Sequence, residues 1–241
     1  MTSDRHSEPY RLWAVIPAAG IGSRMGSAGP KQYLSLHGKT VLEHTLSRIA
    51  GHPHITATVV AIAAADRQWP RIAAGFDESS LVVTHGGAER CHSVLNGLRA
   101  LAGRAAADDW VLVHDAARPC VRREDLERLI EQLQDHPVGG LLGIPVTDTM
   151  KRSDAHGNVI ETIRRDGLWR ALTPQMFRYG MLSRALIAAL ERDVLVTDEA
   201  AAMEMAGYAP RMVEGHADNI KITLPQDLIL ADMYLQQQEK P

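Results

Sequence analysis

The residues best suited to chemistry lie near the start of the chain, between Trp13 and Gln32. An apolar run at residues 12–16 predicts a buried strand that leads into a loop rich in glycine. The loop contains four glycines and two basic residues: Gly20, Gly22, Gly26, Gly29, Arg24 and Lys31. Glycine lets backbone N–H groups approach an anion closely, while Arg and Lys place positive charge beside it. This composition predicts a loop that holds phosphate groups.

Three kinds of phosphate-binding loop can follow a strand in this way. A dinucleotide-binding fingerprint needs G-x-G-x-x-G, but Gly26 comes one residue too late after Gly20. A Walker A loop needs a glycine five residues before Gly38-Lys39-Thr40, where the chain has Tyr33. A nucleotidyltransferase pattern, A-A-G-x-G-x-R-M followed by P-K-Q, matches at every fixed position. A surface loop without a ligand is the remaining alternative, and two basic residues after a buried strand disfavour it.

Composition narrows the class of protein. The chain has 241 residues, of which 45% are hydrophobic and 23% charged, as in an ordinary globular protein with a large core. Its net charge of −3 gives no general attraction to nucleic acid or to membranes, so anionic ligands must be held by local basic clusters. Two cysteines form no disulfide framework, and residues 1–11 lack the apolar core of a signal peptide. These features predict a cytoplasmic protein without a membrane span.

Apolar runs alternate with helical patterns along the chain. Strands are expected at residues 12–16, 54–62, 80–84, 110–114, 138–146 and 211–213, and helices at 41–50, 88–102, 126–133, 185–190, 199–205 and 225–235. This alternation predicts right-handed βαβ crossovers and a mostly parallel sheet with helices on both faces. We find no repeat and no long linker, so residues 1–241 are expected to form one domain.

Residues 147–165 interrupt the alternation. Two short polar strand patterns flank a turn at Asp154-Ala-His-Gly-Asn158, which predicts a β-hairpin. An isolated hairpin buries too little apolar surface to be stable alone. We therefore expect an arm that projects from the domain and packs on a second subunit, giving a homodimer. The alternative is a hairpin folded back onto its own domain.

Unusual side chains follow three of the other predicted strands. Residues 86–93 form a second glycine turn, Asp115 and Arg118 follow the strand at 110–114, and Lys221 follows the last strand. Alone, these could be a helix cap, a surface ion pair and a solvated lysine. Together they predict a shared site, because ligands of parallel sheets bind at the carboxyl ends of the strands. The chain contains no HExxH or GxSxG motif and no histidine pair at metal-ligand spacing.

Seven motifs carry a resemblance to a known family. They occur in this order between about Val15 and Leu230: PAAGxGxRM with PKQ, GGxER with Ser93, VLVHDAARP, DTMK, LWRALTPQ, TDEA and DNIKIT. The chain resembles the 2-C-methyl-D-erythritol 4-phosphate cytidylyltransferases of the non-mevalonate isoprenoid pathway. The resemblance implies a Rossmann-like α/β fold and a homodimer joined through the arm. It also implies transfer of CMP from CTP to methylerythritol phosphate, with Mg²⁺ bound mainly through the CTP phosphates and no metal site on the protein.

The resemblance also implies roles for individual residues. Catalytic roles fall to Arg24, Lys31, Arg165 and Lys221. Contacts to CTP fall to Pro17, Ala18, Ala19, Gly20, Gly22, Gly87, Ala88, Ser93, Asp115 and Ala116. The acceptor pocket is expected to comprise Asp115, Arg118, Thr149, Arg165, Thr173 and Lys221. Ala88 departs from the family pattern, in which a polar residue often follows the two glycines. Any ribose or base contact from that side chain is lost here, so only the backbone role carries over to Ala88.

Three alternative functions remain open at this stage. A cytidylyltransferase of the same fold that acts on ribitol 5-phosphate would share the loop and differ in the acceptor pocket. A dinucleotide-dependent oxidoreductase is disfavoured by the displaced third glycine. A binding module without activity is disfavoured by the retained basic residues. Because the chain ends near Pro241 without an appended cyclase domain, we expect a monofunctional enzyme.

Overall fold

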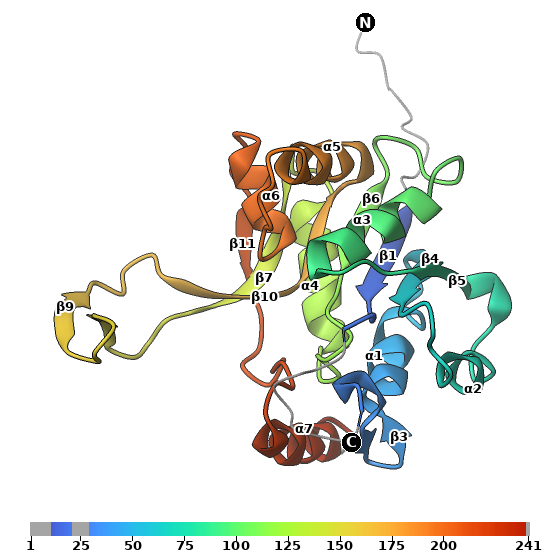
Figure 1. Ribbon diagram of the computed structural model, residues 1–241, viewed down its shortest axis with the longest axis horizontal. Helices are drawn as coiled ribbons and strands as arrows, with labels where there is room; N and C mark the ends of the chain where they lie inside the picture. Colours follow the sequence, from blue (N-terminus) through green and yellow to red (C-terminus); the bar gives the residue numbers. More distant parts are fainter. Residues whose placement is uncertain (1–10, 21–28, 240–241) are drawn as a thin grey trace, which may run out of the picture.

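A seven-stranded sheet forms the centre of the molecule (Figure 1). The computed structural model describes residues 11–20 and 29–239. The strands lie in the order β11-β7-β10-β6-β1-β4-β5. Their bounds are β1 Leu12–Pro17, β4 Ile55–Ile62, β5 Leu81–His85, β6 Trp110–Val113, β7 Gly139–Pro145, β10 Trp169–Arg178 and β11 Arg211–Glu214. A short pair, β2 Ser35–Leu36 and β3 Lys39–Thr40, lies apart from this sheet.

Helices cover both faces of the sheet because the strands are apolar on both sides. In β1, Leu12, Ala14 and Ile16 pack in one core, and Trp13 and Val15 pack in the other. The first core is completed by α1 Val41–Ile49, α2 Trp69–Ala73 and α4 Arg123–Leu133. The second is completed by α3 Arg90–Ala100, α5 Tyr179–Leu190 and α6 Glu199–Met205. The expected α/β architecture is therefore confirmed.

The last helix, α7 Pro225–Gln238, belongs to a third, smaller core. Ala231 and Leu235 pack there with Val41, Ala117 and Ile222. This contact draws residues 218–224, which precede α7, against the segment that follows β6. The backbone N–H of Ile222 donates to the Ala117 carbonyl at 2.8 Å. Lys221 therefore reaches the sheet edge from an irregular segment seven residues beyond β11.

One central strand was not predicted. The segment Trp169–Arg178 forms β10, which is antiparallel to both of its neighbours, β6 and β7. The chain leaves β7, runs through the arm and returns directly, and a direct return can only pair antiparallel strands. The remaining pairs, β1 with β4 and β6, β4 with β5, and β7 with β11, are parallel. The sheet is thus mostly parallel, as expected, with one antiparallel strand in its middle.

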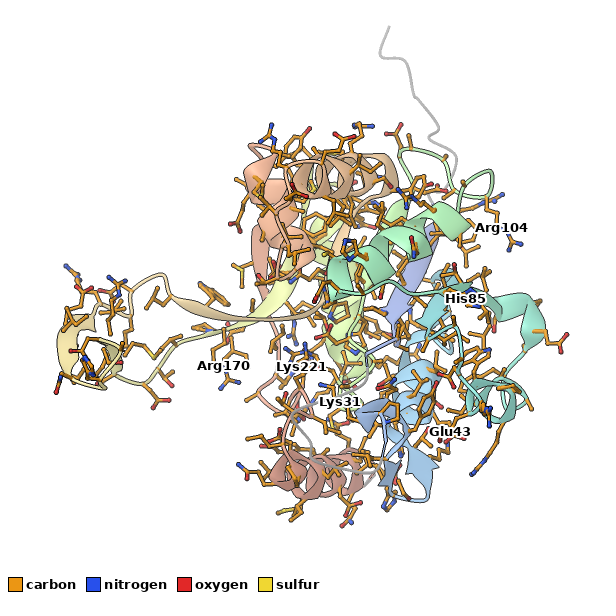
Figure 2. The ribbon with its side chains drawn as sticks, in the orientation of Figure 1. Lys31, Glu43, His85, Arg104, Arg170 and Lys221 are labelled. Carbon is orange, nitrogen blue, oxygen red and sulfur yellow. The ribbon has the colours of Figure 1, made fainter. Side chains whose placement is uncertain are left out.

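Residues 147–165 form the projecting arm that the sequence predicts. Its strands, β8 Met150–Ser153 and β9 Val159–Ile163, pair antiparallel and stand clear of the domain (Figures 1 and 2). Val159 and Ile160 expose 61% and 62% of their surface. The alternative of a hairpin folded back on its own domain is therefore wrong. Packing of the arm on a second subunit stays a prediction.

Further differences concern the element ends and short elements. Helix α5 starts at Tyr179, six residues before the predicted Ala185, and α4 starts at Arg123 rather than Leu126. Two 3-10 turns, Lys31–Tyr33 and Glu78–Ser80, were also not predicted. No helix in the described part of the chain is long and apolar enough to cross a membrane.

Close packing of α3 on β1 gives a test of this architecture. A Cβ atom at Gly97 would lie 2.5 Å from Cγ1 of the buried Val15. We expect Gly97→Ala to lower the free energy of unfolding by about 1–3 kcal/mol, despite the better helix propensity of alanine. Denaturant unfolding of the two single variants and of the double variant Val15→Ala/Gly97→Ala would measure these changes in the free energy of unfolding. The double variant should recover part of the loss, and strictly additive losses would contradict the contact.

Candidate active site

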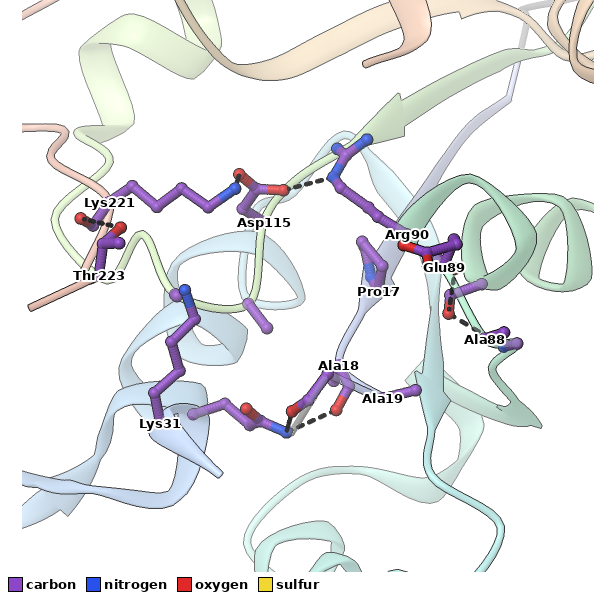
Figure 3. Close-up of a pocket in the computed structure, with 16 residues that line it drawn as sticks. Pro17, Ala18, Ala19, Lys31, Ala88, Glu89, Arg90, Asp115, Lys221 and Thr223 are labelled. Carbon is purple, nitrogen blue, oxygen red and sulfur yellow. Dashed lines mark hydrogen bonds and ion pairs between the residues drawn. The ribbon is translucent and has the colours of Figure 1, made fainter. Parts of the chain in front are cut away.

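A cavity of about 640 Å³ opens at the carboxyl ends of the strands, a volume typical of small-molecule sites. Five segments supply its wall (Figure 3). The lining residues are Pro17–Gly20, Lys31 and Gln32, Gly87–Arg90 with Ser93, Asp115–Ala117, and Lys221 with Thr223. The predicted convergence of the strand ends is therefore observed for the residues that the structure describes.

Gln32 holds the first loop in place. Its side chain is buried, and its Nε2 donates to the carbonyls of Ala18 at 2.7 Å and Gly20 at 3.1 Å. Gln32 sits in the 3-10 turn that also carries Lys31. The ammonium of Lys31 donates to the Ile222 carbonyl at 2.9 Å, and in Figure 3 Lys31 lies on the same side of the cavity as Lys221. The P-K-Q motif thus provides a cation and the amide that fixes the neighbouring loop.

The second glycine turn lies directly against the first loop. A Cβ at Gly86 would come within 2.3 Å of the Ala19 Cβ, so only glycine allows this approach. Ser93, in the first turns of α3, accepts a hydrogen bond from the Gly87 backbone N–H at 3.0 Å and donates to the Glu89 carbonyl at 3.2 Å. These bonds fix the turn and leave its small residues facing the cavity. Such a surface suits a flat ring that approaches the backbone closely.

Asp115 is the centre of the charged side of the cavity. Its Oδ1 accepts from Arg90 Nε at 2.8 Å, and its Oδ2 lies 2.8 Å from Lys221 Nζ (Figure 3). The same Oδ2 lies 3.5 Å from Arg118 Nε. Burial alone would raise the pKa of this carboxyl, but the three cations hold its pKa well below its usual range. Asp115 is therefore ionised at any physiological pH.

A second carboxylate lies behind Arg90. Glu199, the first residue of α6, is 1% exposed and binds both terminal nitrogens of Arg90, at 2.7 and 3.1 Å. Burial raises the pKa of Glu199, an effect that the positive charge of Arg90 opposes. The same two carboxylates raise the pKa of Arg90 against its own desolvation, so Arg90 stays charged. Arg90 thus links a buried helix start to the cavity wall.

A buried chain of polar groups positions Asp115 from behind. Its backbone N–H donates to Thr173 Oγ1 at 3.1 Å, and that hydroxyl lies 3.0 Å from His114 Nδ1. The other ring nitrogen of His114 lies 3.0 Å from the Arg118 carbonyl. Nε2 must carry the proton, because it faces a carbonyl oxygen; Nδ1 then accepts from the Thr173 hydroxyl. Burial lowers the pKa of His114 to about 4, so the imidazole is neutral.

The structure brings most of the predicted site residues together. Those that line the cavity are Pro17, Ala18, Ala19, Gly20, Lys31, Gly87, Ala88, Ser93, Asp115, Ala116 and Lys221. Arg118 and Thr173 lie buried behind Asp115. Thr149 and Arg165 lie at the base of the arm, outside the cavity lining, and Arg165 donates to the Thr147 carbonyl. Gly22 and Arg24 lie outside the described residues.

Sequence reasoning gave no role to three residues that shape the site: Gln32, Arg90 and Glu199. Each lies in a motif that the sequence analysis had singled out, namely P-K-Q, G-G-x-E-R and T-D-E-A. Their contacts join positions far apart in the chain, such as Arg90 and Glu199 at a separation of 109 residues. The motifs were therefore a usable signal for importance, while the role of each residue required the fold.

The oxygen ligands at the cavity limit how a metal ion could bind. Glu89 and Asp115 are the carboxylates among the lining residues, and Asp115 is already surrounded by cations. Within the described residues, no group of three His, Cys, Asp or Glu side chains could hold a metal ion. Such a site fits an ion coordinated mainly by the oxygen atoms of a phosphorylated ligand.

Comparison with known proteins decides the family. The family model described as 2-C-methyl-D-erythritol 4-phosphate cytidylyltransferase matches residues 12–237. The chain belongs to this family. A curated member from Pseudomonas aeruginosa is 57% identical over 219 residues, which cover 90% of this chain and 93% of that protein. A member from Pseudomonas fluorescens is 55% identical over 218 residues, covering 90% and 92%.

Solved structures of the cytidylyltransferase family share the fold. A crystal structure of 4-diphosphocytidyl-2C-methyl-D-erythritol synthase superposes with a TM-score of 0.82 at 40% identity, covering 94% of this chain and all of the other. The Francisella tularensis 2-C-methyl-D-erythritol 4-phosphate cytidylyltransferase has a TM-score of 0.81 at 38% identity, covering 93% of this chain and 99% of the other. The resemblance found in the motifs therefore extends over the whole architecture.

The buried imidazole predicts a pH dependence of stability. His114 has a pKa of about 4 in the folded chain and an ordinary value of 6.5. Between these values the unfolded chain binds more protons, so this group removes stability as the pH falls from 6.5 to 4, by about 3 kcal/mol in all. We expect His114→Gln to flatten the fall in unfolding free energy over this range. The exposed His156→Gln is the matched control, and equal slopes in all three proteins would contradict the prediction.

Proposed function

We propose that this enzyme transfers CMP from CTP to 2-C-methyl-D-erythritol 4-phosphate, giving 4-diphosphocytidyl-2-C-methyl-D-erythritol and pyrophosphate in isoprenoid precursor biosynthesis. Membership of the family supports the reaction. The observation that carries it is the convergence of Lys31, Lys221 and Asp115 at one cavity, beside a loop of small residues. An acceptor that has both a phosphate and hydroxyl groups needs cations and a carboxylate in the same place.

The mechanism follows from the charges. An oxygen of the acceptor phosphate attacks the α-phosphorus of CTP, and the bond to the pyrophosphate leaving group breaks. The attacking oxygen is already ionised near pH 7, so no general base is needed. His114, which is buried and neutral, is not in a position to be one. The barrier comes from bringing two anions together and from charge at phosphorus, which fixed cations lower.

Each side of the cavity has its own proposed role. The cytidine contacts the small residues of the two loops: Pro17–Gly20, Gly87, Ala88, Ser93 and Ala116. Lys31 and Arg24 bind the triphosphate. Lys221 binds the acceptor phosphate, and Asp115 accepts hydrogen bonds from the acceptor hydroxyls. Arg118 and Thr173 support Asp115 from behind. Mg²⁺, carried by the CTP phosphates, would neutralise part of their negative charge.

We further propose a cytoplasmic homodimer. The exposed apolar residues of the arm support dimerisation, because Val159 and Ile160 have no core of their own to enter. Thr149 and Arg165 lie outside the cavity of their own chain, so we assign them to the acceptor pocket of the partner. Two unpaired, buried cysteines, Cys91 and Cys120, are compatible with a reducing compartment.

The reaction is tested by incubating the protein with CTP, Mg²⁺ and one acceptor, and by following pyrophosphate release. We expect release with methylerythritol phosphate and much slower release with ribitol 5-phosphate. Faster release with ribitol 5-phosphate would identify the other cytidylyltransferase activity. No release with either acceptor would refute the proposal, and NAD serves as a negative control for binding.

Hybrid dimers test the shared site. Lys31→Met should lower kcat by roughly 10²–10³, as for the loss of one fixed electrostatic donor, and Arg165→Ala should weaken use of the acceptor. If Arg165 acts on the partner, a co-refolded equal mixture of the two variants contains hybrids with one intact site. Such a mixture should regain about one quarter of wild-type activity. A mixture no more active than its components would place Arg165 in its own subunit or outside the site.

A further inference from the structure

The Glu199 carboxylate is a buried charge that does not touch the cavity. It is 1% exposed, lies outside the cavity lining and is paired with Arg90. Burying an ion pair gains little stability over apolar packing, so such a pair calls for a specific explanation. The contacts of Arg90 on its other side provide one.

Arg90 uses its guanidinium to join two carboxylates. The two terminal nitrogens bind Glu199, and Nε binds Asp115 Oδ1 at 2.8 Å. Glu199 begins α6, Arg90 begins α3 and Asp115 follows β6. The pair therefore connects a helix on one face of the sheet to the carboxylate at the cavity wall.

The two oxygen atoms of Asp115 have different partners. Oδ1 is held by Arg90, whereas Oδ2 is shared by Lys221 at 2.8 Å and Arg118 at 3.5 Å. If Lys221 turns to a phosphate, Asp115 Oδ2 loses the one of its two partners that lines the cavity. Arg90 cannot follow the phosphate, because Glu199 holds its other two nitrogens. Asp115 thus keeps a fixed partner on Oδ1.

Glu199 is not needed to start its own helix. Asp198 already caps α6 by accepting from the Ala201 N–H at 2.9 Å. Gln175, from β10, binds Asp198 through Nε2 at 3.0 Å and accepts from the Ala200 N–H at 2.8 Å. The start of α6 is therefore held by Asp198 and Gln175. The Glu199 side chain is not needed for the helix cap and pairs with Arg90 instead.

We propose that Arg90 and Glu199 are positioning residues for the acceptor substrate: they keep the Asp115 carboxylate in the orientation that binds the acceptor hydroxyls while Lys221 binds the acceptor phosphate. The inference rests on the proposed function above. It assigns Arg90 and Glu199 to binding of the alcohol phosphate, although Arg90 directly follows the glycine turn on the nucleotide side of the cavity.

Glu199→Gln tests the proposal, because it preserves the shape of the side chain and does not touch the cavity. We expect the KM for methylerythritol phosphate to rise about tenfold or more, as for one lost hydrogen bond to a charged group. The KM for CTP should stay within about twofold. The matched control is Glu127→Gln, which removes the exposed pair of Glu127 with Arg123 at 2.8 Å and should change neither KM.

The double variant Arg90→Gln/Glu199→Gln separates positioning from stability. It removes both members of the Arg90–Glu199 pair, while Asp115 keeps Lys221 and Arg118, so its free energy of unfolding should be no lower than that of Glu199→Gln. Positioning requires that the acceptor KM remain raised in the double variant. Recovery of that KM together with stability would overturn the proposal, as would equal rises in both KM values for Glu199→Gln. If Glu199→Gln folds poorly, the double variant still gives the comparison.

Absence of turnover by the wild-type enzyme would refute the proposed function rather than this inference. The two failures are therefore distinguishable, because the positioning test is read as a change in KM relative to an active wild-type protein.

Discussion

A buried carboxylate needs positive charge around it, and the ionised Asp115 organises this site accordingly. Arg90, Arg118 and Lys221 reach it from three parts of the chain. Each of these cations depends on a different supporting element: α3 with α6, the loop after β6, and the segment before α7. The position of one negative charge thus couples the helices on one face of the sheet to the loop after β6 and to the segment before α7. Removing any one of these cations would lower the positive charge around an ionised group in a place of low solvent access.

The architecture supplies the precision that such a cluster needs. Cores on both faces hold β1 and β6 rigidly, and their carboxyl ends present the loop and Asp115 at the same edge. Close contacts set the remaining distances, as at Gly86 against Ala19 and at Gly97 against Val15. Groups fixed in this way, such as Asp115 and Arg90, need little reorganisation when a phosphorylated ligand arrives, which is how electrostatic catalysis gains its effect.

Local patterns were sufficient for much of the fold. Apolar runs located β1, β4, β6 and β7 within one or two residues, because buried strands of a parallel sheet are continuously hydrophobic. Strand β10 was not predicted because its apolar pattern is interrupted by Arg170, Pro174 and Gln175. Its place in the sheet comes from the return of the chain after the arm. The cavity residues were predicted where a motif followed a strand. The links of Gln32 to the first loop and of Glu199 to Arg90 were not, since a sequence does not reveal contacts between distant segments.

The pairing of Lys221 with Asp115 has a consequence for selectivity. An anion that approaches Lys221 must compete with a carboxylate that is already 2.8 Å away. A small inorganic anion forms one contact with Lys221 and displaces another, so its net gain in binding free energy is small. A ligand whose hydroxyl groups return hydrogen bonds to the released carboxylate oxygen recovers that loss. If the enzyme has the proposed function, the internal ion pair would therefore favour polyol phosphates over free phosphate.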